Sequence, residues 1–399
     1  MSKLPLFPVT VVGSWARPPW LLDALRKRKA GQLSQQAFDD IADEAVLLAV
    51  KWQEDAGVDI VSDGEQRRDN YMSFVAEKLE GARLVSLAEL MDMVEDKSGF
   101  EANLRQMDAP AFAIFNPTAV GKLERRGPIA LDEYLFLREH TRKPIKVAMP
   151  GPYLMTRSMF VQGVTDKTYP NRDALAADVV RVLREEIREL IAAGCDFIQL
   201  DEPVFSEVLY KGDTKERTFM CGALSESSGD PDGEMRWAAR LVNAVVTDLP
   251  KGPTIGLHVC RGNWSRQEEV LLRGAYDAML PYLLIMQVDQ YVLEFATPRA
   301  GELGVFSPYA RARELGLGVL NPRSDMVETP GFIRDRVHEA LEFFEPSQIY
   351  LNPDCGFGTF AERPLNPPKV AYAKLRAMAQ AAETLRAEVG ARARGTLVS

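Results

Sequence analysis

Residues 174–202, ALAADVVRVLREEIRELIAAGCDFIQLDE, contain one long helical pattern followed by one short strand-like run. Apolar side chains recur every three to four positions over 174–193, which predicts an amphipathic helix. The apolar run 197–200 is short and directly precedes two acids, so we expect a strand that ends at Asp201 and Glu202. A helix followed at once by a strand is the repeating unit of α/β folds.

The same alternation extends outward from this stretch over most of the chain. The candidate strands are 9–14, 58–65, 145–149, 197–200, 254–259, 293–296, 316–320 and 349–352. All but the last are followed by enough residues for a crossover, and the pattern over 39–56 is helical. Eight such units predict an α/β fold of the TIM (β/α)8 barrel type, with functional side chains at the carboxyl ends of the strands. An open doubly wound sheet is the alternative.

We expect residues 1–399 to form a single domain with one irregular insertion. The stretch 84–141, between the second and third candidate strands, departs from the alternation. Its segment AFAIFNPTAVGKLERRGPIAL predicts a hairpin-like excursion. Residues from about 390 to 399, which include the basic ending ARARGTLVS, are expected to form a flexible tail.

The composition limits the classes of partner. A hydrophobic content of 46% and a charged content of 26% are typical of a soluble globular protein. The net charge of -9 argues against nucleic acid, because phosphate binding needs clustered cations. No run of 18 apolar residues occurs, so no membrane span is expected. The start MSKLPLFPVTVVGS lacks the pattern of a signal peptide and favours a cytoplasmic protein, and the sequence indicates no oligomeric state.

A histidine and two cysteines form the strongest candidate metal site. His258 and Cys260 lie two positions apart at the end of the fifth candidate strand, so their side chains point to the same side. Cys355 follows the last candidate strand and reaches the same rim of a barrel. Imidazole and thiolate ligands favour Zn²⁺, and three protein ligands with an open position are typical of catalysis. Glu294 is a candidate fourth ligand, while ordinary buried cysteines are the alternative.

Two further strand ends carry acidic side chains. The motif DGE places Asp63 and Glu65 after the second candidate strand, and LDE places Asp201 and Glu202 after the fourth. Acids are costly to bury alone, so we expect partners such as a substrate amine, a metal or nearby arginines. Structural ion pairs are the alternative. Ser14 ends the first candidate strand after a glycine, where a ligand can approach the backbone closely.

Seven motifs occur in the order in which one known family carries them. They are VVGSWARP, DGEQRRDN, GPYLMT, QLDEP, HVCRGN, LEFATPR and NPDCGFGT. With these motifs the chain resembles the C-terminal catalytic barrel of the cobalamin-independent methionine synthase family, in a single-barrel core form. The resemblance implies a TIM barrel, one catalytic zinc ion and the alkylation of a thiol.

The resemblance also implies roles for individual residues. The positions that match the family's zinc ligands are His258, Cys260, Glu294 and Cys355. The positions that match those holding the amino-acid part of homocysteine are Ser14, Glu65 and Asp201. These roles suit the side chains, because carboxylates bind an ammonium group and a hydroxyl group can donate to a carboxylate.

The departures from the family concern the methyl donor. The segment GPYLMTRSM lacks a tryptophan that family members have near the folate, and GLGVLNPRSD lacks a histidine that follows the corresponding strand. We therefore expect a zinc-dependent S-methyltransferase of methionine biosynthesis that methylates homocysteine, with a methylfolate or a methylcorrinoid, free or protein-bound, as donor. The alternatives are alkylation of another thiol, as by epoxyalkane:coenzyme M transferases, a decarboxylase on the same barrel, and a zinc protein without catalysis.

Overall fold

The computed structural model describes residues 4–86, 89, 115–210, 229–263, 265–266, 272–308 and 312–395. The chain divides into two compact units. Unit 1 comprises 1–67, 137–146 and 289–399, and unit 2 comprises 68–136 and 147–288. Helix α6 (Leu131–His140) and strand β3 (Lys146–Pro150) each have residues in both.

The other elements are given in chain order, with η for a 3₁₀ helix. Those of unit 1 are α1 (Pro19–Lys29), α2 (Gln35–Ala56), β6 (Gln290–Glu294), η5 (Pro298–Ala300), η6 (Leu303–Phe306), β7 (Glu314–Leu320), α12 (Pro330–Ala340), η8 (Pro346–Gln348), β8 (Ile349–Pro353) and α13 (Pro368–Gly395). Those of unit 2 are α3 (Val75–Lys78), β1 (Leu79–Ser86), β2 (Phe115–Arg125), α7 (Pro152–Met159), η2 (Thr165–Lys167), α8 (Arg172–Ala192), β4 (Phe197–Asp201), α9 (Val204–Tyr210), α10 (Pro231–Val246), β5 (Thr254–Val259), η4 (Tyr276–Ala278) and α11 (Leu280–Leu283).

A parallel sheet positions the strand ends. Its order is β3-β4-β5-β6-β7-β8, and the pairs β4–β5, β6–β7 and β7–β8 are parallel. Isolated parallel bridges join Val9 to Leu351, Thr10 to Ile60 and Val61 to Ile145. Every side chain of β3, β4, β6 and β8 is buried, as expected for parallel strands covered on both faces.

The predicted strands agree unevenly with the structure. Strand β5 has the predicted bounds 254–259, whereas β6 begins three residues before the predicted 293–296. Of the three residues that the prediction omits, Tyr291 and Val292 already belong to the apolar run, and only the buried Gln290 is polar. The predicted strands 9–14 and 58–65 contribute only isolated bridges. Their ends turn instead, and Gly64 and Glu65 both adopt positive φ, of 68° and 53°.

The two long predicted helices are present, and local capping explains their bounds. The predicted helix 174–193 is α8, which begins where the Asn171 side chain accepts the Ala174 N–H at 2.9 Å. The predicted helix 39–56 lies within α2, whose first turn is capped by Ser34. Helix α2 ends at Ala56, and the next residue, Gly57, has a φ of 92°, a left-handed conformation that glycine adopts without steric cost.

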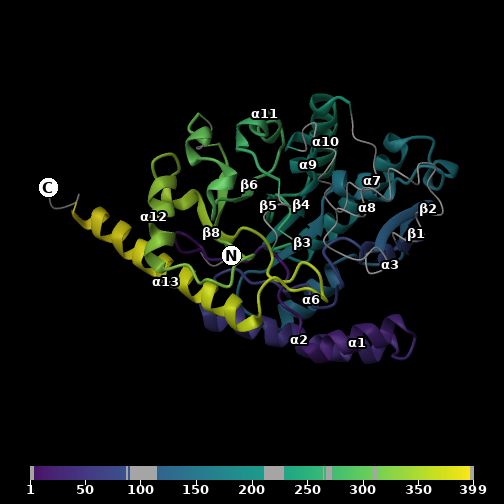
Figure 1. Cartoon of the computed structure of the whole chain (residues 1–399), viewed down its shortest axis with the longest axis horizontal. Helices are drawn as coiled ribbons and strands as arrows, with labels where there is room; N and C mark the ends of the chain where they lie inside the picture. The colour runs from purple at the N-terminus through teal and green to yellow at the C-terminus, as the bar shows by residue number, and fades with distance from the viewer. Residues whose placement is uncertain are drawn as a thin grey trace. The chain divides into compact units, whose positions relative to one another are not determined.

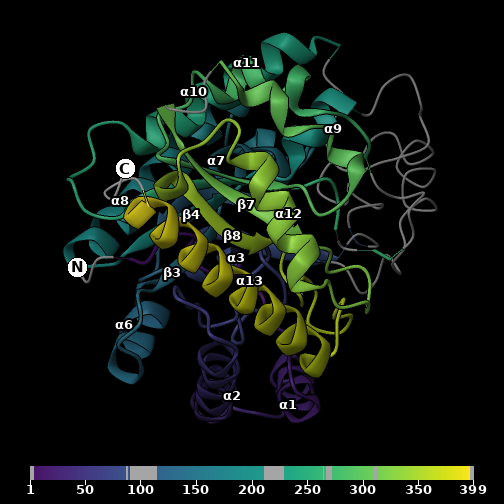
Figure 2. The ribbon, with the colours of Figure 1, turned by 90° about the vertical axis from the view of Figure 1, so that its left-hand side faces the viewer.

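Helices of unit 1 share an apolar core. Leu21 of α1 packs with Phe38 and Ala42 of α2. The rings of Trp52 on α2 and Tyr372 on α13 meet edge to face, with centroids 5.2 Å apart. Figure 2 shows α12 and α13 lying side by side over β7. Helix α13 extends to Gly395, and the flexibility of the predicted tail from about 390 to 399 stays a prediction.

Unit 2 contains a separate antiparallel pair of strands. Strands β1 and β2 pair along most of their length and lie beside α3, α7 and α8 (Figure 1). Arg125 at the end of β2 binds Glu186 and Glu189 of α8, both at 2.6 Å. The hairpin-like excursion stays a prediction, because residues 87–88 and 90–114 lie outside the described residues. Among the helices that the structure describes, none has the length and apolar character needed to span a bilayer.

Candidate functional site

Strands β4 and β5 of unit 2 bring an acid beside a histidine. Asp201 and His258 are register partners in this parallel pair, and both side chains are buried. The Gln199 amide donates to Asp201 Oδ1 at 2.8 Å. Burial raises the pKa of Asp201 to about 6, although the neighbouring His258 and the Gln199 hydrogen bond oppose this rise. The strand end therefore presents a buried carboxyl group that binds a proton more tightly than an exposed aspartate does.

The segment after β5 is held on both sides of Cys260. The Ser206 hydroxyl of α9 donates to the Cys260 carbonyl at 2.6 Å. The Arg261 guanidinium lies 4.0 Å from the centre of the Tyr276 ring and donates to the Gly274 carbonyl at 2.8 Å. Arg261 is fully buried, so these contacts fix the direction in which the chain leaves the strand.

In unit 1, the first loop of the chain packs against the residues after β8. The N–H of Phe357 donates to the Ser14 carbonyl at 2.9 Å. A Cβ on Gly356 would lie 2.2 Å from Ser14 Oγ, so only glycine allows this approach. Ser14 therefore lies next to the residue that follows Cys355, as expected for neighbours at one rim.

The DGE turn joins the same group of residues. Arg17 donates to the Gly358 carbonyl at 2.6 Å and to the Glu65 carbonyl at 2.7 Å. The Glu65 N–H donates to Asp63 Oδ1 at 2.9 Å, which stabilises a left-handed backbone that a residue with a side chain rarely adopts. Such strain is concentrated at functional sites in proteins. Arg17 is a residue that the sequence analysis missed, although it stands three positions after Ser14.

The three predicted soft ligands lie close together. One possible ligand atom from each of His258, Cys260 and Cys355 lies within 4.8 Å of the other two. All three side chains are buried. An imidazole and two thiols form a donor set typical of zinc and unsuited to magnesium or calcium, which prefer oxygen. The residues present thus fit the ion that the sequence predicts.

Glu294 does not belong to that group of described side chains. It ends β6, and its Oε2 accepts a hydrogen bond from Arg299 of η5 at 2.9 Å. Its predicted role as fourth ligand stays a prediction.

Asp354 is a second residue that the sequence analysis missed. It precedes Cys355, and its Oδ1 accepts the N–H groups of Phe295 and Ala296, each at 3.0 Å. Burial, together with the charge of Glu294, raises the pKa of Asp354 to about 7. Its position directly before Cys355 in the NPDCG motif was the only signal in the sequence.

The remaining strand-end side chains have structural partners. Both Glu202 oxygens accept N–H groups at the start of α7, from Tyr153 at 2.8 Å and Leu154 at 2.9 Å. Burial nevertheless raises the pKa of Glu202 well above its usual value. Arg67 forms an ion pair with Asp43 of α2. Arg68 pairs with Glu133 of α6 at 2.6 Å, and neither Asp43 nor Glu133 lies in a strand-end motif.

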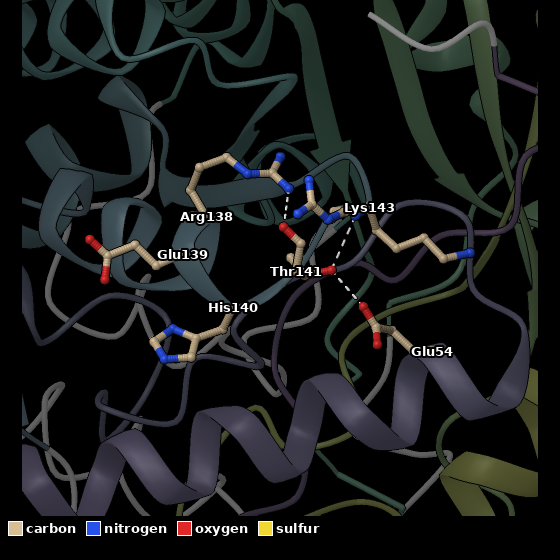
Figure 3. Close-up of a pocket in the computed structure, with 7 residues that line it drawn as sticks. Glu54, Arg138, Glu139, His140, Thr141 and Lys143 are labelled. Carbon is tan, nitrogen blue, oxygen red and sulfur yellow. Dashed lines mark hydrogen bonds between the residues drawn. The ribbon is translucent and has the colours of Figure 1, made fainter.

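A polar cavity of about 810 Å³ lies at the end of α6 (Figure 3). Its lining residues are Glu54, Arg138, Glu139, His140, Thr141, Arg142 and Lys143. The Thr141 hydroxyl donates to Glu54 at 2.5 Å and accepts the Lys143 N–H at 3.1 Å. The cavity precedes β3, at the amino end of a strand, whereas TIM barrels carry their active sites at the carboxyl ends. It contains none of the predicted site residues.

Comparison with known proteins identifies related sequences over nearly the whole chain. The model of the family described as "Cobalamin-independent synthase, Catalytic domain" matches residues 7–384. A methionine synthase of Sulfurisphaera tokodaii is 28% identical over 390 residues, which cover 98% of this chain and 95% of that protein. A methionine synthase of Saccharolobus solfataricus is also 28% identical, over 98% of each chain.

Solved structures share the fold. A B12-independent methionine synthase from Shewanella sp. W3-18-1, in complex with selenomethionine, has a TM-score of 0.71 at 23% identity. The match covers 97% of this chain and 99% of that one. A methyltransferase from Methanosarcina mazei has a TM-score of 0.52 at 15% identity, over 95% of each chain. These likenesses, with the parallel sheet, confirm the predicted α/β TIM-barrel class.

Proposed function

Because the chain belongs to the family of cobalamin-independent synthase catalytic domains, we propose that it is a zinc-dependent S-methyltransferase that converts homocysteine to methionine. Relatives that match along 98% of the chain are named methionine synthases. The observation that carries the proposal is the approach of one imidazole and two thiols to within 4.8 Å of one another. We further propose that the chain acts as a cytoplasmic enzyme of methionine biosynthesis.

The residues that would hold the zinc are His258, Cys260 and Cys355, with Glu294 as an exchangeable fourth ligand. Zinc, when bound, would supply the deprotonation of the substrate thiol at neutral pH and keep it as a thiolate. Two thiolate ligands lower the Lewis acidity of the metal, and this suits a sulfur nucleophile better than the activation of water. The donor set and its burial support this assignment.

The protein's own contribution is to bind and orient the amino acid. We propose that Asp201 and Glu65 bind the ammonium group of homocysteine and that the Ser14 hydroxyl donates to its carboxylate. Two neighbours in the fold support this: Asp201 lies beside His258, and Ser14 lies next to the residue after Cys355. Fixing both ends of the amino acid leaves its sulfur with one direction in which to react.

The methyl donor is proposed as a methylfolate or a methylcorrinoid, the latter free or carried by a corrinoid protein. A test is a matrix of purified protein with homocysteine or coenzyme M as acceptor and methylfolate, methylcobalamin or a short epoxide as donor. We expect methionine from homocysteine with one of the two methyl donors. Alkylation of coenzyme M alone would overturn the acceptor, because the acids at positions 65 and 201 suit an ammonium group and repel a sulfonate.

Cys355→Ser tests the metal part of the proposal. Loss of an outer partner of a metal ligand already costs about 10–100-fold in metal affinity, so loss of a thiolate ligand should cost at least about 100-fold. Zinc content by elemental analysis and the rate of thiol methylation are expected to fall together. The matched control is Cys195→Ser, since Cys195 is buried and hydrogen-bonded to the Phe197 carbonyl instead. Full zinc content and an unchanged rate in the Cys355→Ser protein would contradict the zinc site.

A further inference from the structure

Glu294 and Arg299 form a buried ion pair at the carboxyl end of β6. The two side chains are 1% and 6% exposed, and Arg299 reaches Glu294 Oε2 at 2.9 Å. Arg299 lies in η5, five residues further along the chain, and Gly301 ends this helix with a φ of 81°. The short helix thus brings a guanidinium group back over the strand end from which the carboxylate projects.

The backbone around Glu294 is tied to the backbone around Cys355. Asp354 receives the N–H groups of the two residues that follow Glu294, each at 3.0 Å. Its carboxylate passes over Gly318 of the intervening strand β7, where a Cβ would lie 2.3 Å from Asp354 Oδ1. These hydrogen bonds tie the backbone after β6 to the residue that precedes Cys355. Rotation of the Glu294 side chain is then enough to change its partner.

A buried carboxylate requires a neighbouring cation in each position that it occupies. Removing one partner from a buried ion pair leaves an uncompensated charge, which is strongly unfavourable. If Glu294 occupies the fourth metal position and gives it up to the substrate sulfur, one anionic ligand replaces another. The displaced carboxylate then lies at a site almost closed to water and requires a second cation.

We propose that Arg299 is this receiving cation: it is a positioning residue that holds the Glu294 carboxylate away from the metal while the substrate thiol is bound. The inference rests on the proposed function. Glu294 would exchange between two cations, the metal and the guanidinium group, without a large movement of the backbone. Arg299 thereby raises the affinity for the thiol by lowering the free energy of the displaced carboxylate.

Arg299→Met removes the receiving charge while keeping an apolar stem of similar length. Glu294 should then stay on the metal, so thiol affinity should fall about tenfold, in the range usual for coupled sites. The measurement is a titration of the Co²⁺-substituted full-length protein with homocysteine, followed by visible absorption. Zinc affinity, measured by competition with a chelator, should be retained or increased. Arg299→Lys keeps the charge and should lose less thiol affinity.

The control is Arg299→Met in a protein that also carries Glu294→Gln and so lacks the Glu294 carboxylate. In Glu294→Gln the displaced group carries no charge, so adding Arg299→Met should leave thiol affinity unchanged. Unchanged affinity in Arg299→Met, or an equal loss with Glu294→Gln present, would overturn the inference. Should Arg299→Met not fold, Arg299→Gln replaces it as the neutral variant: weaker thiol affinity in Arg299→Gln supports the inference, and wild-type affinity contradicts it. Failure of the wild type to bind Co²⁺ or Zn²⁺ would instead overturn the proposed function.

Discussion

Asp201 and Glu202 are adjacent in sequence, but their carboxyl groups have different surroundings. Glu202 accepts two backbone N–H groups at the start of α7 and is fully buried. Asp201 lies beside His258 and accepts one hydrogen bond from Gln199. Glu202, the first residue after β4, therefore holds the start of α7, whereas Asp201 lies next to one of the proposed zinc ligands.

Asp201→Asn should weaken substrate binding selectively. A hydrogen bond to a charged group contributes about 1.5–3 kcal/mol, so we expect kcat/KM for homocysteine to fall roughly 10- to 100-fold. Zinc content should stay unchanged, because Asp201 is not among the grouped ligands. The comparison substrate is 4-mercaptobutyrate, which lacks the ammonium group. An equal loss for both thiols would contradict a role of Asp201 in binding the amine.

The sequence predicted residue types better than it predicted their partners. His258, Cys260 and Cys355 come together because strand ends of a barrel share a rim, which the βα pattern already implied. The pair of Glu294 with Arg299 was not predicted. Its formation depends on a 3₁₀ turn between the two residues, and no periodic pattern in LEFATPR indicates that turn.

At the scale of elements, three neighbouring strands and a glycine in the middle one hold the end of unit 1 together. Strands β6, β7 and β8 are neighbours, and Asp354 crosses the middle one above Gly318. Helices α2 and α8 were predicted because amphipathic periodicity extends over many residues. The strands at 9–14 and 58–65 were less well predicted, because the turns at their ends depend on contacts with distant residues such as Arg17.

Gly318→Ala should break the link between β6 and β8. Its Cβ would also lie 2.6 Å from the Leu293 carbonyl, so Asp354 or the strand must move. We expect a loss of about 1–3 kcal/mol in the free energy of unfolding, as is usual for overpacking, together with weaker zinc binding. The matched control is Gly304→Ala, where the nearest atom to the new Cβ is 3.7 Å away. Equal stability and zinc affinity in both variants would contradict the link.

Glu314, the first residue of β7, makes the free energy of unfolding depend on pH. Burial raises the pKa of Glu314, although Tyr350 and Gln290 donate hydrogen bonds to it. The folded state therefore binds a proton at Glu314 more tightly than the unfolded state does. The free energy of unfolding falls as the pH rises from the unfolded pKa of Glu314 through its higher folded pKa. Glu314→Gln should unfold at higher denaturant concentration than the wild type at pH 8. At pH 4 the difference should be smaller, and a constant difference would contradict this assignment.

At the scale of the whole molecule, the proposed metal connects residues far apart in the sequence. Cys260 and Cys355 lie on opposite sides of β6 and β7 in chain order. Ligands that bind only the folded state stabilise it by mass action, by about 4 kcal/mol at 1,000 times the dissociation constant. Zinc should therefore raise the unfolding temperature of the wild type in a concentration-dependent way. The Cys355→Ser protein should show no such rise, and an equal rise in both proteins would indicate binding elsewhere.

The space above Gly318 also constrains how this chain can diverge. An aspartate at position 354 can reach across β7 only while position 318 has no side chain. Among descendants of this protein, substitution at either position should accompany substitution at the other, so the two sites evolve as a pair. A lineage that loses the glycine has to find another acceptor for the two amides beyond Glu294, or give up the fixed spacing of its strand ends.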